Sequence, residues 1–263
     1  MNTPLIFAAA RTHIGRVRSR NDDTALADLK LNLLAVADGL GGRPAGDIAS
    51  RLAIETVTHS LSTMPPSPEV PAHLALHRAV NRANAHVYAM SSRIPGCSGM
   101  GTTLVAGWFV ATPELGLQLI VAHVGDSRLY RFRIQDGPTL TALTRDHTSA
   151  QQLIDEGLYS AEDVRHLPQR HILTNALGVE PEIDIDVLTT PVLPDDVILL
   201  CSDGLSNMLK DSEIQTLLEG APRSSDLELR ELAQTLIDAA NERGGQDNIA
   251  VALAASARPS AQT

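Results

Sequence analysis

Three short apolar runs in this chain each lead into an aspartate. Each run has the length of a buried strand, and the glycines beside the aspartates predict open turns that leave the carboxylates uncovered. The runs and their aspartates are 33–37 with Asp38, 119–124 with Asp126, and 197–201 with Asp203. One Asp-Gly turn after a strand is ordinary, since both residues tolerate the backbone angles of a turn. Three of them at the ends of core strands predict that the carboxylates converge on one site.

Converging carboxylates need compensating charge. Two unit charges about 4 Å apart repel by about 4 kcal/mol at an effective dielectric constant of about 20. Cations or protons must therefore accompany them. Aspartate oxygens, backbone carbonyls and water are the ligands of Mg²⁺, Mn²⁺ or Ca²⁺, whereas Zn²⁺ prefers histidine and cysteine. The pattern predicts a site for hard divalent cations.

Further aspartates occur in similar settings. Asp247 precedes the last apolar run, 249–253, and alone it would be taken for a turn residue. Asp22 and Asp23 end the segment 11–23, which mixes several arginines with acidic residues. This segment is either a solvated loop with local ion pairs, which its composition favours, or a site where an arginine binds phosphate bidentately while the aspartates contact metal. Composition leaves both interpretations open.

Length and composition limit the class of protein. With 263 residues the chain can bury a large core, as one large domain or two small ones. Its formal net charge of -10 argues against a nucleic-acid partner. Only two cysteines occur, Cys97 and Cys201, so a disulfide framework is not expected. The first residues do not resemble a signal peptide, and no apolar run reaches membrane length, so a cytoplasmic location is expected by default.

The hydrophobic periodicity predicts the elements that must position these residues. Strands are expected at 5–10, 33–37, 104–106, 119–124, 128–133, 197–201 and 249–253, and helices at 48–61, 71–90, 211–219 and 226–241. Strands and helices do not alternate regularly, so we predict a layered α+β fold with antiparallel sheets covered by helices. The segment 157–171 has few core residues, and a subdomain or flap inserted between strands is expected there.

Taken in order, the motifs resemble the metal-dependent serine/threonine protein phosphatases of type 2C, the PPM family, in its compact bacterial form. Six segments follow the family's order: 15–23, 38–42, 99–103, 125–128, 202–204 and 245–248. The resemblance covers about residues 8–253. It implies an α-β-β-α sandwich of two antiparallel sheets flanked by helix pairs, with the flap at about 149–178. We expect a single catalytic domain over 1–256 and a disordered tail over 257–263.

The resemblance also implies two core Mn²⁺ or Mg²⁺ ions and a third, weaker site. In the family, one aspartate bridges both core ions, and a glycine carbonyl joins one of them. The ligands implied here are Asp38 for both ions, Asp203 and Asp247 for one, Gly39 with Asp22 or Asp23 for the other, and Asp126 with Asp203 for the third.

The activity implied is hydrolysis of phosphoserine and phosphothreonine in proteins, by attack of a hydroxide that bridges two metal ions. Arg18 would bind the substrate phosphate and offset its charge. Leu40 stands where eukaryotic members carry a histidine taken as the general acid, so the leaving group must be protonated by metal-bound water or another residue. Asp22 stands where glutamate is usual, which makes that contact one methylene shorter.

Two other functions fit parts of the pattern. A pseudophosphatase would bind phosphoproteins without hydrolysing them, but the intact set Asp38, Asp203 and Asp247 disfavours it. A metal-dependent phosphodiesterase or nuclease is disfavoured by the acidic charge and by an aromatic content of 3%. The partners implied are phosphorylated proteins, in particular a cognate serine/threonine kinase and its targets, and neither nucleic acid nor a membrane.

Overall fold

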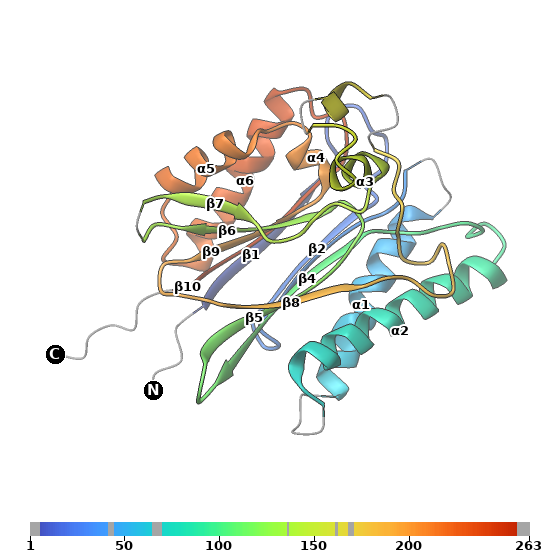
Figure 1. Ribbon diagram of the computed structural model, residues 1–263, viewed down its shortest axis with the longest axis horizontal. Helices are drawn as coiled ribbons and strands as arrows, with labels where there is room; N and C mark the ends of the chain where they lie inside the picture. Colours follow the sequence, from blue (N-terminus) through green and yellow to red (C-terminus); the bar gives the residue numbers. More distant parts are fainter. Residues whose placement is uncertain are drawn as a thin grey trace.

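Two antiparallel sheets form the centre of the structure (Figure 1). The computed structural model describes residues 6–41, 45–64, 70–135, 137–160, 163–167 and 171–256. The tail expected at 257–263 lies outside the described residues.

Each sheet has five strands in the described part of the chain. The first has the order β1 (Ile6–His13), β10 (Ile249–Ser256), β9 (Val197–Cys201), β6 (Arg128–Arg133) and β7 (Thr139–Ala142). The second has the order β2 (Asp23–Asp28), β3 (Leu33–Asp38), β4 (Leu104–Thr112), β5 (Gly116–Val124) and β8 (Asp186–Pro191). The two sheets lie face to face (Figure 1).

Alternation along the strands explains why the sheets stack. In β9, the odd-numbered Val197, Leu199 and Cys201 face the helices, whereas Ile198 and Leu200 face the other sheet. Successive side chains of a strand point to opposite faces, so a strand that is apolar throughout must be covered on both sides. The continuous apolar run in the sequence therefore indicates a central strand in a layered structure.

Helix pairs cover the outer faces of both sheets. The helices α1 (Gly46–Thr63) and α2 (Ala72–Arg93) pack on the second sheet, and α5 (Asp211–Gly220) and α6 (Asp226–Glu242) pack on the first (Figure 1). In α6, Leu229, Leu232 and Leu236 form a buried stripe. The α-β-β-α sandwich predicted from the sequence is confirmed.

Several elements were not predicted. The strands β7 and β8 lie at the sheet edges and consist of exposed and half-buried residues, so neither shows the apolar run of a core strand. The strand β2 and the short helix α4 (Asp203–Ser206) were also missed, and β4 is longer than predicted.

Between β7 and β8 the chain forms the helix α3 (Ser149–Asp155) and the 3-10 turn η1 (Asp163–His166). None of the helices in the described ranges has both the length and the apolar character needed to cross a membrane.

Candidate functional site

Strand pairing places two of the aspartates side by side. Asp38 ends β3, Asp23 begins β2, and the two residues are partners in the antiparallel register. Thr103 holds the backbone of Asp38 in place: the Asp38 N–H donates to Thr103 Oγ1 (3.0 Å), and the Thr103 N–H donates to the Asp38 carbonyl (2.9 Å). The Thr103 hydroxyl also lies 2.7 Å from Ser127 Oγ. Thr103 thereby links the strand end that carries Asp38 to the turn that carries Asp126.

The first sheet supplies the opposite side of the same site. Asp203 follows β9 and Asp247 precedes β10, and these two loops are in close contact: a Cβ added to Gly204 would lie 1.9 Å from the Asn248 carbonyl oxygen. Ser202 connects the two sheets, because its hydroxyl donates to Asp23 Oδ2 at 2.7 Å. Residues from four separate strand ends are thus fixed relative to one another.

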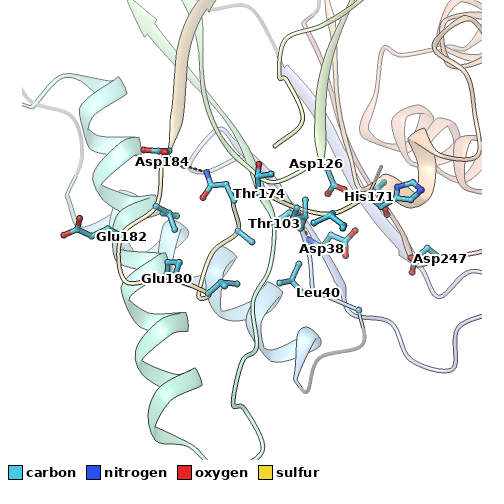
Figure 2. Close-up of a pocket in the computed structure, with 18 of the residues that line it drawn as sticks. Asp38, Leu40, Thr103, Asp126, His171, Thr174, Glu180, Glu182, Asp184 and Asp247 are labelled. Carbon is cyan, nitrogen blue, oxygen red and sulfur yellow. Dashed lines mark hydrogen bonds between the residues drawn. The ribbon is translucent and has the colours of Figure 1, made fainter. Parts of the chain in front are cut away.

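Five of the predicted site residues line one cavity of about 1020 Å³. They are Arg18, Asp38, Asp126, Asp203 and Asp247. Figure 2 shows the carboxylates of Asp38 and Asp126 near one another, with Asp247 farther along the same side. Residues 171–176 also line the cavity, and Figure 2 shows Glu180, Glu182 and Asp184 on the side away from Asp247.

Burial and mutual repulsion raise the pKa values of these carboxyls. The pKa of Asp38 lies well above its usual value because the group is desolvated and because Asp23, Asp203 and Asp126 are close. Desolvation, and then the charge of Asp203, likewise raises the pKa of Asp126. Desolvation is also the main cause that raises the pKa of Asp203 to about 6 and that of Asp23 to about 8. A cation bound among these carboxylates would offset their mutual repulsion.

The chemistry of these donors fits hard divalent cations. Asp23 Oδ1 and Asp203 Oδ1 are buried and accept no hydrogen bond from any described residue. Buried polar atoms without partners are rare in folded proteins and commonly mark an ion or water site. Since all the converging side-chain donors are carboxylate oxygens, Mn²⁺ or Mg²⁺ suits the cluster better than Zn²⁺.

Arg18 is the arginine of the N-terminal segment that reaches the cavity. Its Nη2 atom lies 2.6 Å from Asp247 Oδ2, and its side chain is 44% exposed. The hydrogen bond to Asp247 raises the pKa of Arg18, with smaller contributions from the charges of Asp203 and Asp38. The guanidinium therefore lies at the mouth of the acidic site with part of its fork open to solvent.

Three predicted residues do not line the cavity: Asp22, Asp23 and Gly39. The Asp22 carboxylate faces Arg20, whose Nε lies 2.6 Å from Oδ1. Gly39 donates its N–H to the Asp22 carbonyl (3.2 Å), and a Cβ there would lie 2.3 Å from the Gly46 carbonyl oxygen. Their roles as metal ligands stay predictions.

Sequence reasoning missed the residues that brace the aspartates. Thr103 and Ser202 entered the sequence analysis only as members of the segments 99–103 and 202–204. Asn248 is another, since its amide donates to the carbonyls of Ile14 (2.8 Å) and Arg20 (2.9 Å) and accepts from the Asp22 N–H (2.8 Å). All three lie within the motif segments 99–103, 202–204 and 245–248, and this position is the sequence signal that could have identified them.

The raised pKa of Asp203 predicts that the stability of the metal-free protein, measured in EDTA, depends on pH. Its folded pKa is about 6, against about 3.9 in an unfolded chain. Between these two pKa values the Asp203 carboxyl is protonated in the folded protein and ionised in the unfolded chain. The free energy of unfolding therefore falls as the pH rises through this range. We expect Asp203→Asn to melt above the wild type at pH 7 and to lose this advantage near pH 4, by calorimetry in EDTA. The exposed α6 substitution Asp238→Asn should show no such change; an advantage independent of pH would contradict the assignment.

Comparisons with known proteins agree with this geometry. The sequence matches the protein phosphatase 2C family over residues 10–254. It is 35% identical over 254 residues to the serine/threonine phosphatase stp of Listeria welshimeri, covering 94% of this chain and 95% of that relative.

Solved structures show the same fold. The Mycobacterium tuberculosis serine/threonine phosphatase PstP/Ppp superposes with a TM-score of 0.83 at 35% identity, covering 96% of this chain and 99% of the other. A structure of the catalytic domain of PstP in complex with two manganese ions has a TM-score of 0.81 at 35% identity, covering 97% of this chain and all of the other. The chain belongs to the protein phosphatase 2C family.

Proposed function

We propose that this chain is a metal-dependent serine/threonine protein phosphatase that hydrolyses phosphoserine and phosphothreonine in proteins. The observation that carries the proposal is the meeting of Asp38, Asp126 and Asp203 on one open cavity with Arg18 at its edge. Family membership and the relatives named as serine/threonine phosphatases support it.

The proposed cofactors are two core Mn²⁺ or Mg²⁺ ions and a third ion at a weaker site. Asp38 would contact both core ions, Asp203 and Asp247 one of them, and Gly39 with Asp22 or Asp23 the other; Asp126 would join Asp203 at the third. Of the two adjacent aspartates, Asp23 is favoured, because its carboxyl lies beside Asp38. When bound, such ions neutralise phosphoryl oxygens and lower the pKa of water.

The chain's own residues position the substrate. Arg18 contacts Asp247 through one Nη atom, so the open part of its planar fork can bind phosphoryl oxygens. Thr103 holds the backbone of Asp38, and Ser202 orients the carboxylate of Asp23. Leu40 lines the cavity but has no proton to give, so the leaving alkoxide takes its proton from water or another group.

The proposed substrates are phosphoproteins, including a cognate serine/threonine kinase and its targets. We propose one catalytic domain over 1–256, in which the segment 149–178 acts as the flap; its residues 171–176 line the cavity wall. A cytoplasmic location stays a prediction.

Peptide specificity tests the proposed function. Purified protein with Mn²⁺ should release phosphate from phosphothreonine and phosphoserine peptides faster than from a phosphotyrosine peptide of the same sequence. Binding of the peptides without turnover would instead support the pseudophosphatase alternative, for which neither the site nor the comparisons give support. Hydrolysis of phosphodiester substrates in place of the peptides would also contradict the proposal.

Arg18→Ala is expected to weaken substrate capture more than turnover. Hydrogen bonds to a charged group contribute about 1.5–3 kcal/mol, so KM should rise by about 10- to 100-fold while kcat falls less. Steady-state kinetics on a phosphothreonine peptide measures this split. The control Arg78→Ala removes an exposed arginine of α2 and should change neither constant. An unchanged KM in Arg18→Ala would remove Arg18 from the phosphate site.

A further inference from the structure

A buried histidine near the active site has no role in the proposed reaction. His123 lies on β5 and is 1% exposed, and neither of its ring nitrogens has a hydrogen-bond partner in the described part of the chain. The backbone of Ser127 lies near the ring and acts to raise its pKa. Burial, with the nearby His147, lowers the pKa of His123 to about 4. The ring is therefore neutral at pH 7 and presents an unused lone pair.

Two other metal-ligating side chains surround this ring. His147 lies with its ring centroid 4.7 Å from that of His123, and its Nε2 atom is 3.1 Å from Asp186 Oδ2. Asp186 begins β8 and is the register partner of His123 across the two strands. One donor atom from each of the three residues lies within 4.8 Å of the others.

We propose that His123, His147 and Asp186 bind a divalent transition-metal ion of the Zn²⁺ class, at a site separate from the aspartate cluster. Two imidazoles and one carboxylate, with water in the fourth position, suit a tetrahedral ion with ligand distances of about 2.0–2.2 Å. Nitrogen ligands select such ions over Mg²⁺. None of the three residues lines the catalytic cavity.

The site is coupled to the cavity through Asn175. The Nδ1 atom of His147 faces the Gly125 N–H (3.3 Å) and Asn175 Nδ2 (3.1 Å). Coordination through Nε2 would move the single ring proton, which faces Asp186, to Nδ1, and Nδ1–H would then need an acceptor. Turning the Asn175 amide by half a turn supplies its oxygen, at the loss of the 2.6 Å bond from Nδ2 to the Asp184 carbonyl.

Through this rearrangement, metal binding at the histidine site would affect the catalytic cavity. Asn175 and Asp184 both line the catalytic cavity, and Gly125 precedes Asp126. The backbone N–H of His147 also donates to the Gly125 carbonyl at 2.8 Å. His147 and the turn that carries Asp126 are therefore held together at two points. Metal binding at the histidine site would therefore change the contacts of Asn175, which belongs to the proposed flap and lines the cavity.

Co²⁺ binding in excess Mg²⁺ tests the proposal without reference to activity. The full chain carrying Asp38→Asn, which disables the aspartate site, is dialysed against Co²⁺ and Mg²⁺, and bound cobalt and its visible spectrum are measured. We expect one equivalent of Co²⁺ with the absorption of a nitrogen-ligated ion. Adding His123→Ala should abolish it, and adding Asp186→Asn should weaken binding at least about tenfold. Adding His73→Ala, an exposed histidine of α2, should change nothing.

Two results would overturn the site. One is no cobalt uptake by the Asp38→Asn protein, and the other is uptake that His123→Ala and Asp186→Asn leave unchanged. If His123→Ala does not fold, Asp186→Asn decides, because the Asp186 side chain is 61% exposed at the sheet edge and its loss leaves no cavity.

Discussion

Asp38→Asn is expected to lower turnover of a phosphothreonine peptide by at least about 1000-fold. The substitution keeps the size of the side chain and the backbone bonds to Thr103, but it removes the charge at the centre of the cluster. Loss of about 4 kcal/mol of charge stabilisation in the transition state corresponds to about 1000-fold. Steady-state kinetics with saturating Mn²⁺ measures the change.

A stability measurement separates this loss from unfolding. In EDTA, Asp38→Asn should melt at or above the wild-type temperature at pH 7, because it relieves repulsion among buried carboxyls. The control Asp238→Asn lies on the exposed face of α6 and should keep both full activity and wild-type melting. Wild-type turnover by Asp38→Asn would remove Asp38 from the catalytic site.

Gly204→Ala is expected to cause the largest loss of stability. The added methyl group would lie 1.9 Å from the Asn248 carbonyl oxygen, which is backbone and cannot rotate away, and 3.4 Å from Ile249 Cγ1. Such overpacking costs about 3 kcal/mol or more, which lowers the melting temperature by about 6–12 °C in a chain of this size. Calorimetry of the metal-free protein measures the shift.

The matched control is Gly220→Ala at the end of α5. A Cβ at Gly220 meets no atom within 4 Å, so this variant should melt at or slightly above the wild-type temperature. Equal melting of the two variants would show that the loops carrying Asp203 and Asp247 are not packed as described.

The sequence predicted the fold class and the convergence of Asp38, Asp126 and Asp203 because both depend on local patterns. A core strand covered on two faces is a continuous apolar run, and a glycine-rich turn marks where it ends. The edge strands β7 and β8 lack such a run, because solvent covers part of their surface. Pairing with a neighbour defines them, and a single sequence does not show pairing.

The choice between Asp22 and Asp23 also required the structure. They are neighbouring aspartates in one segment, so the sequence alone does not show which of them faces the other carboxylates. The register of β2 against β3 brings Asp23 beside Asp38, whereas the Asp22 carboxylate faces Arg20. The meeting of His123, His147 and Asp186 is likewise tertiary, because each residue comes from a different part of the chain.

We propose that the aspartate cluster holds divalent metal ions for hydrolysis of phosphoserine and phosphothreonine. Phosphate release from a phosphothreonine peptide by the purified protein, with Mn²⁺, with Mg²⁺ and with EDTA, tests it most directly. We predict release with either metal, background release with EDTA, and recovery when Mn²⁺ is restored in excess. Release in EDTA equal to that with Mn²⁺ would contradict the claim.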